Sequence, residues 1–206
     1  MTKGNLIVIS GPSGTGKGVI CKRLLRQNSN LAISISMTTR APRKGEVDGR
    51  EYYFVSKEKF EDEIAKGGLL EYANVFDIGN YYGTPKSKVM KELELGKDII
   101  LEIDIEGGRQ VKQSYKDALM IFLAPPNMNE LRERIIKRGT EQKEVIDRRL
   151  DEAIKELEAI DEYDYLIIND KVEEATRKIE AILTAEKSKV TKGTFEKVQK
   201  MMKEEE

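Results

Sequence analysis

The stretch NLIVISGPSGTGKG, residues 5–18, decides the fold. Its first part, NLIVIS, is a short run rich in β-branched residues, which is typical of a buried strand. Residues 17–27 then carry apolar side chains at helical spacing. Between them lies the pattern G-x-x-x-x-G-K, in the strand, loop and helix setting that a phosphate-binding loop requires. The stretch therefore predicts an α/β unit that binds the phosphates of a nucleotide.

The loop residues have separable tasks. Glycines let successive backbone N–H groups converge on a phosphate, the helix N-terminus adds positive potential, and Lys17 is expected to reach the β- and γ-phosphates. The predicted ATP-binding residues of the loop are Gly11, Pro12, Ser13, Gly14, Thr15, Gly16, Lys17 and Gly18. Position 18, where the motif usually carries a Mg²⁺-ligating hydroxyl, is glycine, and Val19 follows. The loop predicts phosphate binding but leaves open how Mg²⁺ is held.

Similar apolar runs recur at residues 99–105, 119–123 and 165–168, each followed by a helical pattern. Continuous apolar strands that alternate with helices predict a parallel sheet covered on both faces. Residues 36–84 differ, because they combine arginines, tyrosines and glycines, and there we expect a small insertion built partly of antiparallel strands. We interpret residues 1–206 as one domain. Its parts are a core (1–35, 85–126 and 151–187), an insertion (36–84), a helical lid (127–150) and a helical tail (188–206).

The composition limits which partners, locations and catalytic residues the chain can have. The 36 basic and 37 acidic residues give a net charge of −1, so no global field favours nucleic acid or a membrane surface. The single cysteine, Cys21, and the absence of a long apolar run favour a cytoplasmic location. Without histidine, a His general base or His metal ligand is excluded. Oligomeric state stays open between a monomer and a homodimer.

Further segments stand in a fixed order along the chain. They are residues 36–46 (SMTTRAPRKGE), 70–73 (LEYA), 80–84 (NYYGT), 102–104 (EID) and 138–140 (RGT). With the phosphate loop, they resemble the guanylate kinase family of P-loop nucleoside monophosphate kinases, from about Leu6 to Ile182. The resemblance implies a P-loop NTPase fold with a GMP-binding insertion and a helical lid. It also implies transfer of the γ-phosphoryl group of ATP to GMP or dGMP in purine metabolism, giving ADP and GDP with Mg²⁺ as cofactor.

The resemblance assigns the acceptor site to the insertion. The implied GMP-binding residues are Ser36, Arg40, Arg43, Tyr52, Glu71, Tyr82, Gly83, Thr84 and Asp104. The two arginines and the two tyrosine hydroxyls would donate hydrogen bonds to the GMP phosphate. Glu71 would accept from the N1–H and N2–H donors of guanine, and Ser36 and Thr84 would donate to O6.

The implied catalytic residues are Lys17, Arg40, Arg43, Asp104, Arg134, Arg138 and Arg149. The lid arginines would neutralise transition-state charge, and Asn169 would lie beside the adenine of ATP. Asp104 closes an apolar strand. It is expected to meet Mg²⁺ through water, to meet the phosphate or ribose of GMP, or to cap a helix. No general base is needed, because the GMP phosphate, with a second pKa near ~6, is already largely dianionic at neutral pH.

Two alternatives remain in view. Guanylate-kinase-like domains can act as binding modules without catalysis, but they typically lack the intact phosphate loop found here. The Gly16-Lys17-Gly18 ending suggests an adenylate-kinase-like activity, against which Thr39-Arg40 and Glu71 argue. A coupled assay with each monophosphate would separate these possibilities.

Overall fold

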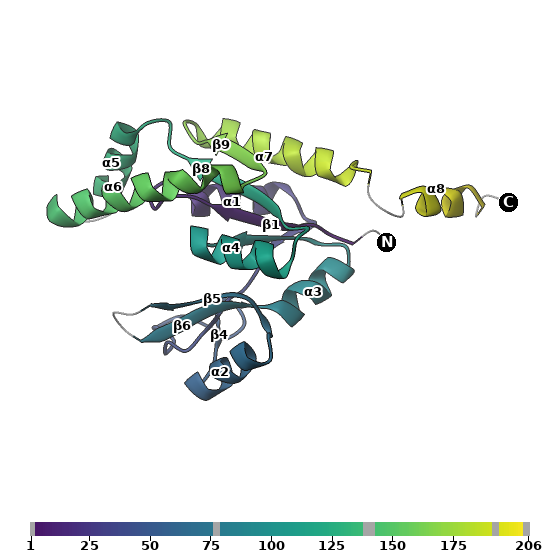
Figure 1. Ribbon diagram of the computed structural model, residues 1–206, viewed down its shortest axis with the longest axis horizontal. Coiled ribbons are helices and arrows are strands. Elements are labelled where there is room, and N and C mark those ends of the chain that lie inside the picture. Colours follow the sequence, from purple (N-terminus) through teal and green to yellow (C-terminus); the bar gives the residue numbers. More distant parts are fainter. Residues whose placement is uncertain (1–2, 76–78, 138–142, 191–193, 204–206) are drawn as a thin grey trace.

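The computed structural model describes residues 3–75, 79–137, 143–190 and 194–203. Its core is a parallel sheet of β1 (Leu6–Ser10), β2 (Leu31–Ile33), β7 (Asp98–Glu102), β8 (Leu119–Ala124) and β9 (Tyr165–Ile168). The strand order is β2-β7-β1-β8-β9, so β1 lies in the middle (Figure 1). The predicted parallel α/β fold is confirmed.

Alternation along β1 explains why helices cover both faces of the sheet. Ile7 and Ile9 pack against α1 (Lys17–Gln27) and α7 (Val172–Lys187). Leu6 and Val8 point the other way, toward α3 (Lys86–Glu94) and α4 (Ile105–Ser114). Both faces of the sheet are therefore covered, which leaves its edges for ligands. The chain leaves β1 at the carboxyl edge, where ligands bind in open α/β folds.

The insertion forms a separate sheet of β3 (Met37–Thr38), β4 (Tyr53–Phe54), β5 (Leu69–Val75) and β6 (Asn80–Pro85), in the order β4-β3-β6-β5. β3 pairs parallel with β4 and antiparallel with β6, which confirms the predicted mixed insertion. It also contains α2 (Lys57–Ala65), a helix that we did not expect from the sequence. Phe60 of α2 is fully buried and stacks on Tyr81, so this helix closes the far side of the sheet.

The remaining helices are α5 (Met128–Lys137), α6 (Lys143–Leu157), a short 3-10 helix (Glu158–Glu162) and α8 (Thr194–Lys203). α5 and α6 pack through Leu131, Ile135, Ile146 and Ala153. The predicted lid boundary at residue 150 falls inside α6, which continues to Leu157 without a break. The expected tail helix is present as α8 (Figure 1), and none of the described helices is long and apolar enough to cross a membrane.

Candidate active site

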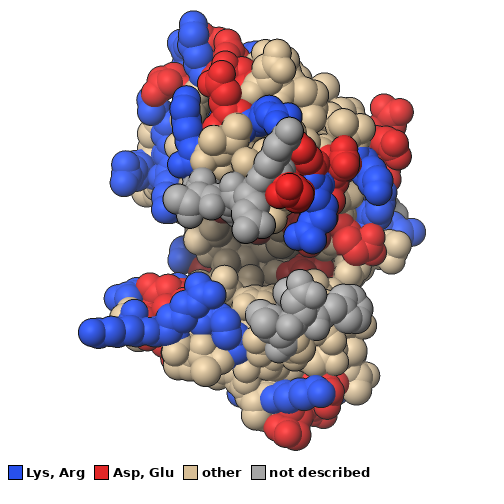
Figure 2. Space-filling model, turned by 90° about the vertical axis from the view of Figure 1, so that its left-hand side faces the viewer, with Lys and Arg blue, Asp and Glu red and all other residues tan. Residues whose placement is uncertain are grey.

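A hollow lies between the core and the insertion, which form the upper and lower bodies of Figure 2. The predicted ATP-binding residues belong to the core, on the loop between β1 and α1 and just beyond β9. Most of the predicted GMP-binding residues belong to the insertion, and Asp104 approaches from the core. The arrangement suits two ligands that meet across the hollow.

The phosphate loop is held by its own hydrogen bonds. Gly14 and Gly16 adopt φ angles of 90° and 92°, a left-handed conformation that glycine reaches without strain. The Thr15 hydroxyl donates to the Pro12 carbonyl at 2.8 Å. Lys17 Nζ donates to the carbonyls of Gly11 at 2.5 Å and Pro12 at 3.3 Å, so its ammonium group is folded back over the loop.

Asn169 braces this loop from the opposite side. Its side chain is buried, and Nδ2 donates to the Thr15 carbonyl at 2.7 Å. A Cβ at position 16 would lie 2.7 Å from the same nitrogen, so the close fit requires glycine there. Arg134 Nη1 donates to the Asn169 carbonyl at 2.9 Å, which ties α5 to the same segment. The position of Asn169 beside adenine stays a prediction.

Two acidic residues lie at the end of β7, one as its last residue and one just beyond it. The strand ends at Glu102, whose Oε1 lies 3.3 Å from where a Cβ on Gly18 would be. Asp104 lies beyond the strand, contrary to our expectation that it closes it. Instead it caps α4, with Oδ1 accepting from the Gly107 N–H at 2.7 Å. The sequence analysis overlooked Glu102 as a site residue, because only the strand order places it beside the phosphate loop.

Glu156 near the end of α6 is a second residue that the sequence analysis overlooked. It is half-buried, and its carboxylate lies close to the backbone N–H of Ser13 in the phosphate loop. Burial raises its pKa, and the charge of Asp104 adds to this effect while Lys17 opposes it. Glu156 also lines one cavity with Asp104. In the sequence, one glutamate among many on a charged helix carries no signal of this position.

The three arginines predicted for the lid lie in different places. Arg134 is tied to the segment after β9, as described above. Arg149 lies on α6 and is half-buried. It precedes Glu156 by seven residues, about two helical turns, so the two side chains share one face of α6. Arg138 lies outside the described residues.

The guanine end of the predicted site is built on β5 and β6. Glu71 is 7% exposed and accepts from the Thr84 hydroxyl at 2.5 Å. Burial raises the pKa of Glu71 to about 7, although the hydrogen bond from Thr84 opposes the shift. A Cβ on Gly107 would lie 3.4 Å from Glu71 Oε2 and 3.3 Å from Asp104 Oδ1. The structure therefore brings Glu71, Thr84 and Asp104 together.

Two other predicted residues of this end act through their backbone. A Cβ on Gly83 would lie 2.8 Å from the Glu71 carbonyl, so glycine allows β5 and β6 to approach closely. Ser36 directly precedes β3 and is half-buried, and its carbonyl accepts from the Tyr53 N–H at 2.9 Å. Gly83 thus positions the strands that carry Glu71 and Thr84, whereas Ser36 joins the start of β3 to β4.

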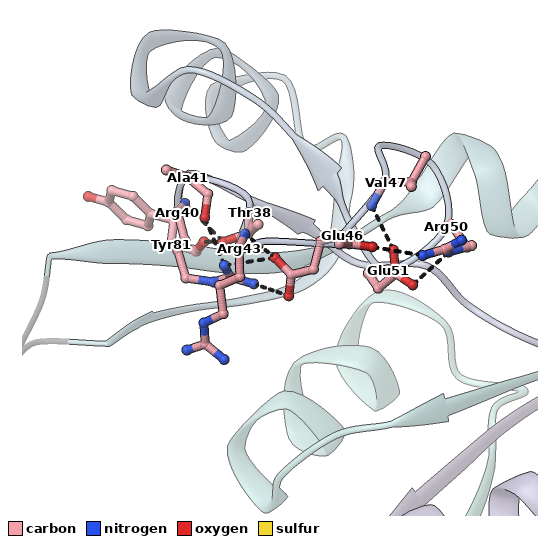
Figure 3. A network of polar contacts seen from close by, with 10 residues as sticks. Thr38, Arg40, Ala41, Arg43, Glu46, Val47, Arg50, Glu51 and Tyr81 are labelled. Atoms are coloured by element: carbon pink, nitrogen blue, oxygen red, sulfur yellow. Dashed lines mark hydrogen bonds and ion pairs between the residues drawn. The ribbon is translucent and has the colours of Figure 1, made fainter.

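The phosphate end gathers one arginine and two tyrosines. The Arg40 guanidinium lies 5.4 Å from the centre of the Tyr52 ring, and Tyr52 meets Tyr82 edge to face at 5.8 Å. Arg40 is also paired with Glu46, a residue that the sequence analysis quoted but gave no task. The exposed Arg43 points its guanidinium away from that carboxylate (Figure 3).

Comparison with known proteins agrees with this geometry. A family model described as guanylate kinase matches residues 3–186. The chain is 57% identical over 190 residues to a guanylate kinase of Clostridium tetani, covering 92% of this chain and 90% of that protein. It is 55% identical over 188 residues to one of Clostridium perfringens (strain 13 / Type A), with 91% and 86% covered.

A solved structure extends the agreement from sequence to fold. The crystal structure of guanylate kinase from Anaplasma phagocytophilum superposes with a TM-score of 0.70 at 34% identity, covering 92% of this chain and 89% of that one. Because the family model spans most of the chain and the relatives match over nearly their full length, the chain belongs to the guanylate kinase family.

Proposed function

We propose that the protein transfers the γ-phosphoryl group of ATP to GMP or dGMP, giving ADP and GDP or dGDP. The observation that carries this proposal is the pairing of an intact phosphate loop on the core with the buried Glu71–Thr84 pair on the insertion. The first supplies a donor site and the second an acceptor site. The family membership of the chain supports the same reaction.

Selection of guanine follows from the chemistry of Glu71. An ionised carboxylate only accepts hydrogen bonds, and guanine offers the N1–H and N2–H donors side by side. Adenine has an acceptor at N1, so AMP would leave the buried carboxylate of Glu71 unpaired. Sites that depend on such hydrogen bonds reject the wrong ligand by roughly 10⁴–10⁵-fold.

Catalysis would rest on position and charge. The acceptor phosphate is already largely dianionic, so the barrier lies in bringing two anions together in line. Lys17, Arg134 and Arg149 would neutralise the transferred group, with Arg138 assigned the same task by resemblance. Arg40, Arg43, Tyr52 and Tyr82 would fix the GMP phosphate. Exclusion of water from the closed hollow would prevent hydrolysis of ATP.

The acidic residues beside the loop fit a magnesium ion carried by ATP. Mg²⁺ prefers oxygen ligands and usually keeps several waters. The carboxylates of Glu102 and Asp104 would hold that water shell, and the bound ion would neutralise phosphate charge. The described residues contain no group of three or more His, Cys, Asp or Glu that could hold a metal without the nucleotide. Water and phosphate oxygens would therefore complete the coordination.

A coupled assay of ADP formation tests the proposal, with ATP and with GMP, dGMP or AMP in turn. We expect rapid turnover with GMP and dGMP and almost none with AMP. Preference for AMP would indicate an adenylate-kinase-like activity. Binding of GMP without transfer, at saturating ATP and Mg²⁺, would indicate a non-catalytic binding module.

A further inference from the structure

The ion pair between Arg40 and Glu46 is unusually enclosed for two residues on a surface segment. The Arg40 side chain is 11% exposed and that of Glu46 is 18% exposed. Arg40 Nη2 donates to Glu46 Oε1 at 2.9 Å, and Nη1 donates to Oε2 at 3.0 Å. The Arg43 backbone N–H also donates to Oε2, at 2.7 Å. Glu46 is thus fixed by backbone and side chain together (Figure 3).

These contacts determine which part of the guanidinium remains available. Nη1 makes a second bond, to the Ala41 carbonyl at 2.7 Å. A guanidinium carries five N–H donors in a planar arrangement. The bonds to Glu46 and Ala41 account for both N–H groups of Nη1 and one of Nη2. The Nε–H and the second N–H of Nη2 remain, and they form a single fork on one edge.

The two tyrosines of the predicted phosphate site lie next to this guanidinium. The Tyr82 hydroxyl lies near the same guanidinium and contributes, after Glu46, to raising the pKa of Arg40. The rings of Tyr52 and Phe54 lie 5.4 Å and 5.8 Å from the guanidinium and limit its rotation. Two parallel N–H donors match two oxygens of a phosphate.

We propose that Glu46 is a positioning residue that aims this fork of Arg40 at the phosphate of GMP. The proposal rests on the proposed function for the identity of the ligand. A guanidinium held in place loses little freedom when the phosphate arrives, which strengthens binding. The Arg40 guanidinium holds the pKa of Glu46 below its ordinary value, so the carboxylate stays ionised at neutral pH. The opposite possibility is that Glu46 competes with the phosphate for Arg40.

Glu51 supplies a matched control in the same segment. Its carboxylate accepts from Arg50 Nε at 2.7 Å and from the Val47 backbone N–H at 2.8 Å (Figure 3). It therefore also joins an arginine to the backbone, but that arginine is not among the predicted GMP-binding residues. Glu51→Gln should leave GMP binding unchanged.

The test measures dissociation constants of GMP and guanosine by titration calorimetry, for the wild type, Glu46→Gln and Glu51→Gln. Loss of hydrogen bonds to a charged group predicts that Glu46→Gln weakens GMP binding by about 10–100-fold. Guanosine has no phosphate, so its binding should not change. Equal or tighter GMP binding by Glu46→Gln would overturn the proposal, and so would an equal loss of guanosine binding.

A second pair of variants separates positioning from a general effect on the loop. In an Arg40→Lys background the fork is absent, so Glu46→Gln should cause little further loss. Fully additive losses would overturn the proposal. If Glu46→Gln does not fold, Glu46→Asp is measured instead, because it keeps the charge but is too short for all three bonds. Selective loss of GMP over guanosine is again expected. A wild type that binds GMP without transferring phosphate would refute the proposed function alone.

Discussion

The hydroxyl of Thr84 donates to the carboxylate of Glu71 across the β5–β6 pair, where Glu71 is almost completely buried. The bond favours the ionised carboxylate, whereas burial favours the protonated form. Burial is the stronger effect and raises the pKa of Glu71 to about 7. The pKa of Glu71 thus remains near neutral pH, where binding of a ligand can change its protonation state.

Guanine binding should consequently strengthen as the pH rises through about 7. Only the ionised form of Glu71 can accept both guanine N–H donors, so binding releases a proton from the fraction that is protonated. Guanosine is the suitable probe, because the phosphate of GMP titrates in the same range. Calorimetry from pH 5.5 to about 8.5 should show this dependence in the wild type. It should be absent in Glu71→Gln, and a flat wild-type profile would contradict the assignment.

The same pKa predicts an effect on stability. The ordinary pKa is 4.5, so the folded protein holds the Glu71 proton more tightly than the unfolded chain does. The protonated Glu71 side chain therefore contributes to the free energy of unfolding. The contribution is complete below about pH 4.5 and is lost as the pH rises through about 7. Glu71→Gln cannot ionise and should therefore melt higher relative to the wild type at pH 8 than at pH 5. Thermal scans should show a difference of roughly 2–4 °C for each kcal/mol. A difference that does not change with pH would be inconsistent with the raised pKa.

Lys17→Met should leave the fold intact and lower kcat by roughly 10²–10³-fold, since its charge offsets charge on the transferred phosphoryl group. Lys22→Met, at an exposed position of the same helix, serves as the control and should keep wild-type turnover. Circular dichroism checks the fold of both variants. Near-wild-type kcat in Lys17→Met would remove this lysine from the mechanism.

The carboxylates beside the phosphate loop should govern the magnesium requirement. We expect Glu102→Gln and Asp104→Asn to raise the Mg²⁺ concentration for half-maximal rate or to lower turnover severely. Gly18→Ser would place its side chain beside the flexible end of Glu102, so it should be tolerated and lower that concentration. Magnesium titrations at saturating ATP and GMP decide this, with Glu106→Gln as the control on α4. Activity that persists in excess chelator would refute the account.

Removing the charge of Glu156 should tighten binding of a non-hydrolysable ATP analogue. The Glu156 carboxylate lies near Lys17 and the backbone of Ser13, where it opposes the arrival of further negative charge. The amide of Glu156→Gln has nearly the same size and shape but carries no charge. Glu158→Gln, at an exposed position two residues further along the chain, is the control. Calorimetry that shows weaker or unchanged binding would contradict this prediction.

Much of the fold is predictable from the sequence, because β1, the phosphate loop and α1 lie within one stretch of local pattern. The positions of Glu102 and Glu156 are not, since each depends on contacts between segments far apart in the chain. β7 lies beside β1, although nearly ninety residues separate them along the chain. α2 was missed because its single fully buried apolar residue, Phe60, gives only a weak periodic signal.

The unbroken course of α6 has a mechanical consequence. Its fifteen residues form a rod of about 22 Å, with Arg149 near the middle and Glu156 at one end. Pivoting such a rod by about 10° at its Glu156 end would swing the other tip by about 4 Å. Glu156 lies beside Ser13 of the phosphate loop, so an unbent α6 that pivots at this end turns about a point next to the predicted ATP phosphates. In that geometry, nucleotide binding and lid movement would act at the same end of α6.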